Sequence, residues 1–246
     1  QGPTTGGTTV TLTGTNLSGA TAVSFGGVAA TSFTVNSATR ITAITPPRTA
    51  GAAAVTVTTP GGTSNPDNPS AYFYYAAPPS LIAVTPASGT TAGGTTVILN
   101  GTDLLGATAV RFGGVAATSF TVNSATRITA ITPSRTAGAA AVTVTTPGGT
   151  SNPADYVYVA SPTLVSLVPG QGPTHAGTVI TLTGTDLAAT TDVRFDSTPA
   201  SFTVVSPTQI TAVAPAGGAG PVGVRATTPA GTSNSLTYTR VAAPGI

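Results

Sequence analysis

The stretch FGGVAATSFTVNSATRITAITPPRTAGAAAVTVTTPGGTSNP occupies residues 25–66 and recurs at residues 112–153 with a single change, Ser134 in place of Pro47. A diverged third copy includes RFDSTPASFTVVSPTQITAVAP at residues 194–215. The first two copies begin 87 residues apart. This period is longer than the roughly 20–50 residues of solenoid repeats and suits a domain that buries its own core. The sequence therefore predicts three tandem domains of one fold.

Short runs within each copy alternate polar and apolar residues and are rich in β-branched or aromatic side chains. Clusters of Gly, Pro, Asn and Ser separate the runs, and turn signals recur about every 8–12 residues, which is typical of β-sandwiches. No stretch has a helical period. The sequence therefore predicts an all-β protein. The strands expected in the first copy are residues 9–13, 22–25, 32–35, 41–44, 54–58 and 72–75.

Apolar residues of these runs are predicted to form each core, and the second core should use the equivalent positions 87 residues further on. The paired glycines of the first two copies are predicted to form tight turns, because no helix follows them as a phosphate-binding loop would require. The predicted core of the first copy is Val10, Leu12, Val23, Phe25, Phe33, Val35, Ile41, Ile44, Val55 and Val57. The turn glycines are Gly26-Gly27, Gly61-Gly62, Gly113-Gly114 and Gly148-Gly149.

Each unit resembles the IPT/TIG domain, an immunoglobulin-like fold of plexins, some transcription factors and many bacterial surface proteins. The residues that carry the resemblance in the second copy are LIAVTP (81–86), GTTAGGTTVILNGTDL (89–104), AVRFGG (109–114), SFTVNSATRITAITP (119–133), AVTVTTPGGTSN (141–152) and YVYV (156–159). The resemblance implies immunoglobulin-like β-sandwiches of the bacterial extracellular type, and fold alone leaves function open.

The predicted boundaries place domain 1 at residues 1–77, domain 2 at residues 78–160 and domain 3 at residues 161–240. Residues 241–246 are expected to be a linker or the start of a further module. The two junctions between domains are short and contain Pro, which makes them semi-rigid spacers. The expected arrangement of the three tandem immunoglobulin-like sandwiches is therefore an extended rod.

Domains 2 and 3 begin with an extra predicted strand, Leu81–Thr85 and Leu164–Val168, that domain 1 lacks. The first residues, Gln1-Gly2-Pro3, align with Gln171-Gly172-Pro173, which follow that strand in domain 3. Two explanations remain open: the chain is cut from a longer repeat array, or a segment of another subunit completes the first sandwich by β-augmentation. The absence of Met also leads us to expect a processed chain or a segment of a longer one.

Only 6% of the residues are charged, with eight Arg, six Asp and a net charge of +2. A net charge near zero favours association. The absence of Cys excludes disulfides and thiolate metal sites, and it fits a secreted protein. No apolar run reaches the roughly 18 residues of a membrane span. Nucleic-acid binding is not expected, because phosphate contacts need clustered Arg and Lys. We interpret Arg40, Arg48, Arg127 and Arg135 as isolated solubilising charges.

Residues with catalytic or metal-binding chemistry are few and scattered. His175 is interpreted as a loop residue, because a triad would also need a nucleophile and an acid beside it. Asp192 and Asp196 flank one strand and are interpreted as turn acids in preference to a Ca²⁺ site. The recurring Asn16, Asp103 and Asp186 are interpreted as turn residues. No catalytic, cofactor or metal site is therefore predicted.

Aromatic residues gather on the last strand of each copy, where they are interpreted as edge-strand packing or as a sugar-binding platform. These residues are Tyr72, Phe73, Tyr74, Tyr75, Tyr156, Tyr158 and Tyr238.

The favoured function is a non-enzymatic extracellular repeat protein that forms a cell-surface stalk, fibre or filament and self-associates head-to-tail or laterally. Two alternatives remain: an adhesin or carbohydrate-binding spacer of a larger secreted protein, and a virion fibre or decoration protein. A cell-surface or glycan ligand is a further possible partner, whereas neither nucleic acid nor membrane insertion is expected.

Overall fold

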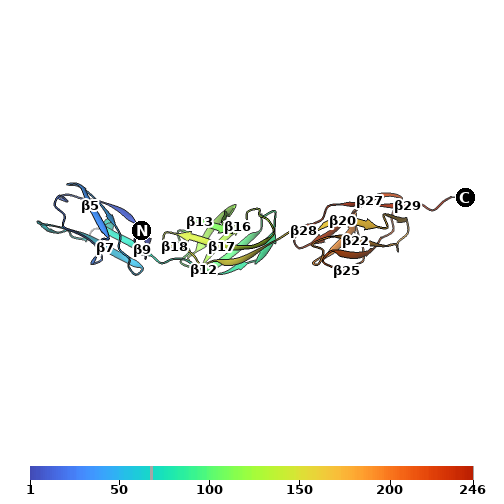
Figure 1. Ribbon diagram of the computed structural model, residues 1–246, viewed down its shortest axis with the longest axis horizontal. Helices are drawn as coiled ribbons and strands as arrows, with labels where there is room; N and C mark the ends of the chain where they lie inside the picture. The colour runs from blue at the N-terminus through green and yellow to red at the C-terminus, as the bar shows by residue number, and fades with distance from the viewer. Residues whose placement is uncertain (67–68, 246) are drawn as a thin grey trace. The chain divides into compact units, whose positions relative to one another are not determined.

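The computed structural model describes residues 1–66 and 69–245, so Asp67, Asn68 and Ile246, the last residue of the predicted linker, lie outside the described residues. Within the described part, the strands form six sheets that group as three sandwiches of two sheets each (Figure 1). The remaining regular element is a short 3₁₀ turn, η1 (Pro69–Ala71). The all-β class and the three immunoglobulin-like sandwiches predicted from the sequence are confirmed.

The first sandwich packs a three-stranded sheet, in the order β2-β6-β5, against a six-stranded sheet, in the order β1-β9-β7-β3-β4 with β8 paired to β7. Its strands are β1 (Gly2–Pro3), β2 (Thr9–Thr13), β3 (Ala22–Phe25), β4 (Val28–Ala29), β5 (Ser32–Ser37), β6 (Arg40–Ile44), β7 (Gly51–Thr59), β8 (Gly62–Thr63) and β9 (Tyr72–Ala76).

The second sandwich has one more strand, because its smaller sheet has the order β10-β12-β16-β15. The larger sheet has the order β11-β19-β17-β13-β14, with β18 paired to β17. The strands are β10 (Ser80–Thr85), β11 (Ser88–Thr90), β12 (Thr96–Thr102), β13 (Ala109–Phe112), β14 (Val115–Ala116), β15 (Ser119–Ser124), β16 (Arg127–Ile131), β17 (Gly138–Thr146), β18 (Gly149–Thr150) and β19 (Ala154–Val159).

The third sandwich repeats the topology of the second, with the orders β20-β22-β26-β25 and β21-β29-β27-β23-β24 and with β28 paired to β27. Its strands are β20 (Thr163–Val168), β21 (Gln171–Pro173), β22 (Val179–Thr185), β23 (Asp192–Phe195), β24 (Thr198–Pro199), β25 (Phe202–Ser206), β26 (Gln209–Val213), β27 (Gly220–Thr228), β28 (Gly231–Thr232) and β29 (Leu236–Val241). The predicted extra strands at the start of domains 2 and 3 are therefore confirmed as β10 and β20.

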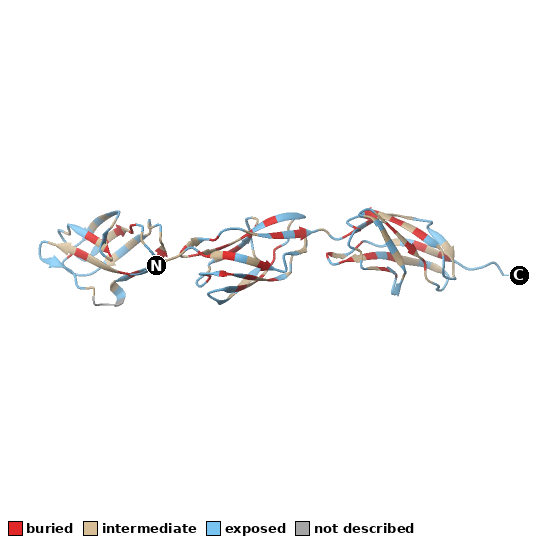
Figure 2. Cartoon of the chain, turned by 90° about the horizontal axis from the view of Figure 1, so that it is seen from below, coloured by how far each residue is buried: buried red, intermediate tan, exposed pale blue. Residues whose placement is uncertain are grey.

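Buried and exposed residues alternate along the strands, as the two-residue period of a strand requires (Figure 2). In the first sandwich Val23, Phe25, Ile41 and Val57 are buried as predicted. Ile44 is a correction, because a residue three positions after Ile41 faces the opposite side of its strand. The inward position next to Ile41 belongs instead to Ala43, which is fully buried, and Ile44 is only half-buried.

The first core also uses residues that were not in the predicted core. Phe73 packs edge-on against Phe25 and against Tyr75, with ring centroids 5.8 Å and 4.9 Å apart. Edge-to-face pairs of this kind are a favoured aromatic geometry. The last strand, β9, therefore contributes two of the larger side chains of the first core.

Candidate strand-acceptor site

The structure leaves the predicted catalytic and metal candidates apart. His175 is exposed, and its Nδ1 lies 3.1 Å from the carbonyl oxygen of Ala176. Asp192 forms an ion pair with Arg194 on the same strand. Across residues 1–66 and 69–245, His and Asp side chains nowhere gather in a group of three that could hold a metal ion.

The recurring Asn16, Asp103 and Asp186 all lie in left-handed backbone, with φ of 57°, 56° and 57°. Asn and Asp tolerate this conformation better than other residues with a side chain, because their short polar groups bond to nearby backbone. The predicted turn role of these three residues is confirmed.

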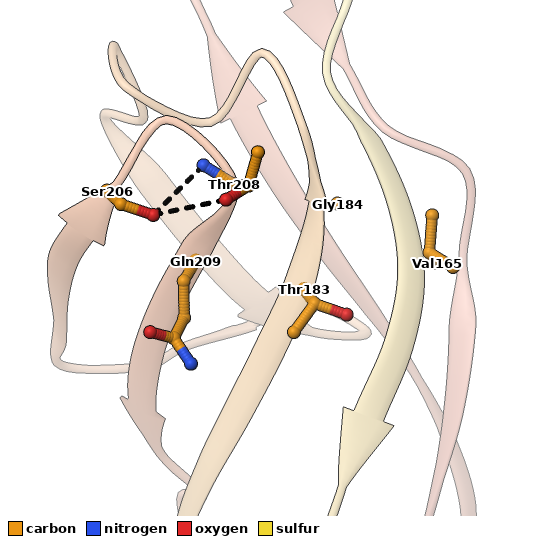
Figure 3. A pocket seen from close by; sticks show the side chains of 6 residues that line it. All are labelled: Val165, Thr183, Gly184, Ser206, Thr208 and Gln209. Carbon is orange, nitrogen blue, oxygen red and sulfur yellow. Dashed lines mark hydrogen bonds between the residues drawn. The ribbon is translucent and has the colours of Figure 1, made fainter.

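One open hollow of about 430 Å³ lies on the smaller sheet of the third sandwich (Figure 3). Ser206 Oγ accepts a hydrogen bond from the backbone of Thr208 and lies 3.2 Å from its Oγ1. The same Ser-x-Thr turn recurs at Ser37 and Ser124 in the other two sandwiches. The turn beside the hollow is therefore a repeated structural feature of the domain. Its lining residues are Val165, Thr183, Gly184, Ser206, Thr208 and Gln209.

Arg48 is not the isolated solubilising charge that the sequence predicted. It is half-buried, and its Nη1 donates a hydrogen bond of 2.8 Å to the carbonyl oxygen of Phe25. A Cβ on Gly26 would lie 1.3 Å from this nitrogen, so the glycine makes room for the guanidinium. Burial raises the pKa of the nearby Tyr75 phenol, and the Thr45 side chain and the Arg48 charge oppose that rise. Arg48 is therefore a structural residue.

The third sandwich receives a guanidinium group from a strand, whereas Arg48 lies in the loop between β6 and β7. Gly217 takes the place of Arg48, and its backbone N–H makes the equivalent loop hydrogen bond. Arg240 on β29 is buried, donates from Nε to the carbonyl oxygen of Pro215 at 3.2 Å, and lies 5.9 Å from the centre of the Phe195 ring. A Cβ on Gly217 would lie 2.6 Å from Arg240 Nη1. The third sandwich therefore has glycine at the position equivalent to Arg48 and supplies its guanidinium from Arg240 instead.

Asp196 occupies the position that Gly26 holds in the first sandwich, and it keeps the left-handed backbone with φ of 52°. Its Oδ1 accepts a hydrogen bond of 2.8 Å from the backbone N–H of Gly223. A side chain is tolerated here because Gly217 replaces the arginine that would collide with it. The sequence had already marked this turn as different in the third copy.

The aromatic residues of the last strands divide into two sets. Phe73, Tyr75, Tyr156, Tyr158 and Tyr238 are buried in the cores. Their strands lie between two others, so the prediction of packing is correct but its placement at a sheet edge is wrong. Tyr72 and Tyr74 point outward on β9 with 40% and 56% of their surfaces exposed. Opposite them on β7 lie Ala54 and Ala52, whose small side chains leave both rings accessible.

The main asymmetry between the sandwiches is the outer edge of the smaller sheet. β12 pairs with β10 on one side and β16 on the other, and β22 likewise pairs with β20 and β26. In the first sandwich β2 pairs with β6 only, among the residues that the structure describes. An edge of this kind presents a row of backbone N–H and C=O groups that can pair with an added strand.

Core side chains beside this edge are incompletely covered. Leu81 and Val84 of β10 are buried in the second sandwich, where Leu99 of β12 has no exposed surface. The counterpart of Leu99 is Leu12, which is only half-buried and packs at the border of the first core. Val10 shows the same loss of cover. The β2 edge therefore combines unpaired backbone with accessible apolar side chains.

Comparison with known proteins identifies the family of the three domains. The family model for the IPT/TIG domain matches residues 1–72, 79–158 and 162–239. None of the described residues forms a helix with the length and apolar character that a membrane crossing requires. No curated protein sequence matches the chain.

Among solved structures, the full extracellular region of plexin A4 is 25% identical with a TM-score of 0.45, over 90% of this chain and 20% of that chain. The Escherichia coli adhesin FdeC is 19% identical with a TM-score of 0.40, over 97% and 93%. A structure with a xylogluco-oligosaccharide is 17% identical with a TM-score of 0.39, over 94% and 57%. The chain thus spans about a fifth of the plexin region and just over half of the oligosaccharide-bound protein.

Proposed function

The chain belongs to the IPT/TIG domain family, and on this premise we propose that it is a non-enzymatic extracellular repeat protein that forms a surface stalk or fibre. Three consecutive domains of one fold, each with a core of its own, make a spacer whose length grows with the number of copies. The side chains with catalytic chemistry lie apart in the described residues, which supports a structural or binding role.

Self-association is the second part of the proposal. With 6% charged residues and a net charge of +2, little electrostatic repulsion opposes contact between copies. Exposed apolar side chains such as Ile82, Val165 and Val205 stand on the outer faces of the smaller sheets. Such faces favour lateral contact between neighbouring chains.

The observation that supports this part is the edge of β2, which pairs with β6 alone among the described residues. We propose that a further strand, from the same longer chain or from a neighbouring copy, pairs with β2 and covers Leu12 and Val10, as β10 covers their counterparts in the second sandwich. The strand should have the chemistry of Ser80–Thr85, in which Leu81 and Val84 are buried and polar residues stand at both ends. A strand from a neighbouring copy would assemble the domains head-to-tail.

A synthetic peptide with the sequence of residues 80–86 tests this proposal on the full chain. We expect the peptide to bind and to slow hydrogen exchange at the backbone amides of β2, because it would supply the missing ladder partner. β12 serves as the internal control, since β10 already covers it. Failure of the peptide to bind or to protect β2 would refute strand addition.

Sedimentation of the chain, measured without and with the peptide, identifies the source of the natural strand. Self-association that the peptide suppresses identifies the neighbour as a second copy. A monomer that binds the peptide shows that a second copy does not supply the strand. Filaments in electron micrographs that persist when β2 is blocked would contradict head-to-tail assembly by this edge.

A second candidate function is glycan binding, favoured by the outward pair Tyr72 and Tyr74. Side chains two positions apart on a strand lie about 7 Å apart on one face, so both rings can contact one extended ligand. The small Ala52 and Ala54 beside them leave an accessible aromatic platform. The face of an aromatic ring offers the apolar contact that the C–H face of a sugar needs.

A glycan array with the wild-type chain and the double variant Tyr72→Ala/Tyr74→Ala tests this function. We expect the double variant to lose the signals that the wild type gives. The matched control is Val157→Ala, which alters the position equivalent to Tyr74 in the second sandwich and should change nothing. Equal signals from the wild type and the double variant would remove the platform from consideration.

A further inference from the structure

The outer faces of the larger sheets differ between the first and second sandwiches at only a few positions. β7 and β17 have the same sequence, so their outward side chains are the same Ala and Thr residues. On the last strand, Tyr72 of the first sandwich corresponds to Asp155 of the second, and Tyr74 corresponds to Val157. The inward positions of this strand are aromatic in both sandwiches. The two faces therefore differ in the outward rings while the strand beside them is the same.

The strand on the other side of β7 carries a further difference. Ser24 on β3 points outward opposite Thr56, and their hydroxyl oxygens lie 2.7 Å apart. Arg111 takes the place of Ser24 in the second sandwich and is exposed. Together with Asp155 on β19, it gives the second face one charged side chain on each side of β17.

The third sandwich has a charged face without rings. Thr237 and Thr239 of β29 occupy the positions of the two tyrosines. Arg194 and Arg225 point outward directly opposite each other on β23 and β27. The rings are therefore a property of the first sandwich among the three copies.

The face of the first sandwich is uncharged. Within the described residues, the outward side chains of β3, β7 and β9 belong to Ala, Ser, Thr and Tyr alone. A face of this kind cannot compensate the desolvation of a charged ligand, so the ligand that suits it is neutral. The outward residues are Ala22, Ser24, Ala52, Ala54, Thr56, Thr58, Tyr72, Tyr74 and Ala76.

The aromatic platform formed by Tyr72 and Tyr74 does not depend on how the β2 edge is completed. Both residues stand on the larger sheet, whereas the additional strand β10 of the second sandwich belongs to the smaller sheet. In that sandwich, Val157 at the position of Tyr74 has 44% of its surface exposed, and Asp155 at the position of Tyr72 is also exposed. These positions are therefore accessible in a sandwich with the full set of strands.

The two rings of the platform follow one straight strand. β9 and β7 pair in regular register from Tyr72 opposite Ala54 to Tyr75 opposite Gly51, without a bulge. Residues two apart on such a strand stand about 7 Å apart on one face. Rings in line suit a straight, ribbon-like sugar chain that presents the C–H faces of successive units, which is the shape of β-1,4-linked polysaccharides. Each phenol hydroxyl can also donate to and accept from sugar hydroxyl groups.

We propose that the aromatic platform of the first sandwich binds a neutral β-1,4-linked polysaccharide, and that the second and third sandwiches do not bind it. This inference rests on the glycan binding put forward above as the second candidate function. The sugar chain lies along β9, with its rings against Tyr72 and Tyr74. The three copies thereby divide into one binding domain and two spacer domains.

Isothermal titration calorimetry of the full chain with three soluble polysaccharides tests the ligand class. Hydroxyethylcellulose is a neutral β-1,4-linked chain, carboxymethylcellulose is the same backbone with carboxylates, and dextran is a neutral chain with another linkage. We expect hydroxyethylcellulose to bind about tenfold or more tightly than the other two. Its affinity should stay unchanged between about 50 and 500 mM salt, because charged groups take no part in the contact.

Variants of the platform test the residues. Tyr72→Ala/Tyr74→Ala should weaken the binding of hydroxyethylcellulose about tenfold or more, because both ring contacts are lost. Tyr72→Phe/Tyr74→Phe keeps both rings and should lose only about threefold. This conservative pair separates the ring contact from the contribution of the phenol hydroxyls.

A graft onto the second sandwich gives the sharpest test, because β17 already supplies the same neighbouring strand. In the Tyr72→Ala/Tyr74→Ala background, Arg111→Ser/Asp155→Tyr/Val157→Tyr rebuilds the uncharged face with its two rings. We expect this graft to restore the affinity to within about threefold of the wild type. The matched control is Arg111→Ser alone in the same background, which should restore nothing.

The outcomes keep this inference apart from glycan binding itself. Binding of carboxymethylcellulose or dextran through Tyr72 and Tyr74, without binding of hydroxyethylcellulose, leaves glycan binding standing and overturns the ligand class. Binding that survives the loss of both rings, or a graft that restores nothing, overturns the assignment to the platform. A wild type that binds no glycan overturns both, and loss of self-association in Tyr72→Ala/Tyr74→Ala would then assign the face to contact between copies.

Discussion

The first and second sandwiches share an almost identical stretch of sequence, yet their cores are not equally buried. Val142 has no exposed surface, whereas its counterpart Val55 is only half-buried. Val57 keeps 7% of its surface exposed and Val144 none. The identical stretch has the same strands in both copies, so the difference comes from residues outside it, of which β10 is the largest addition. Identical local sequence thus determines where side chains point, and the complete set of strands determines how well they are covered.

The largest expected effect is a difference in stability between these two sandwiches. Burying Leu81 and Val84 should stabilise the second sandwich by about 1.5–3 kcal/mol for each side chain. We therefore expect the first sandwich to unfold at a lower urea concentration. Hydrogen exchange followed by mass spectrometry resolves the two, because β2 and β12 differ in sequence. Unfolding of both at one concentration would contradict this comparison.

Truncation of the paired core leucines should reproduce the difference at one position. Leu99→Ala removes a fully buried side chain and should destabilise its sandwich by about 3–5 kcal/mol. Leu12→Ala removes a half-buried one and should cost its own sandwich about half as much. Local unfolding free energies from hydrogen exchange measure both. Equal costs would mean that β10 does not explain the burial of Leu99.

Gly101 and Gly14, which occupy equivalent positions in the second and first sandwiches, should show the next largest contrast. Gly101→Ala forces the backbone of β10 away from β12 and should destabilise the second sandwich by about 1–3 kcal/mol. Gly14→Ala has space for its methyl group and should change the first sandwich by no more than about 0.5 kcal/mol. Urea unfolding of each variant gives the comparison, and an equally damaging Gly14→Ala would show that the glycine serves the first sandwich itself.

The smallest effect concerns the titration of Tyr75. Burial raises the pKa of this phenol above its ordinary value of about 10. Because the folded state favours the neutral form, the stability that Tyr75 contributes is fully present below pH 10 and is lost as the pH rises through the folded-state pKa. Tyr75→Phe should remove this pH dependence from the first sandwich. Unfolding of the wild type and of Tyr75→Phe between pH 8 and pH 12 measures this pH dependence. In the variant, the stability difference between the first and second sandwiches can then be compared without the contribution of Tyr75.

Much of the fold followed from the sequence because strand signals are local. The alternation of polar and apolar residues located most strands, and the repeat period separated the three sandwiches. The extra strands at Leu81 and Leu164 were visible from the same pattern. The prediction for Ile44 was wrong because it ignored the strict two-residue period, which a fully buried Ala43 satisfies.

The candidate site was less predictable, because its parts lie far apart in the chain. The open edge could be inferred from the missing strand, but the amide of Asn152 reaches Leu81 across 71 residues. No motif in the sequence pairs these two residues. The strand and turn pattern also gave no reason to expect that Arg48 is half-buried. It put Tyr72 and Tyr74 on the opposite face from Tyr75 but did not decide which face is buried.

The sequence by itself determined that the chain is three copies of one β-sandwich, that an extra strand opens the second and third copies, and where the turns lie. Each of these conclusions depends on periodicity, composition or the backbone preference of a residue such as Asn16, which act over a few neighbouring positions. The tertiary structure alone decided which side chains meet the added strand, how completely each core is covered, and which strand supplies the buried guanidinium of Arg240. Those outcomes depend on contacts between strands that the topology brings together from distant parts of the chain.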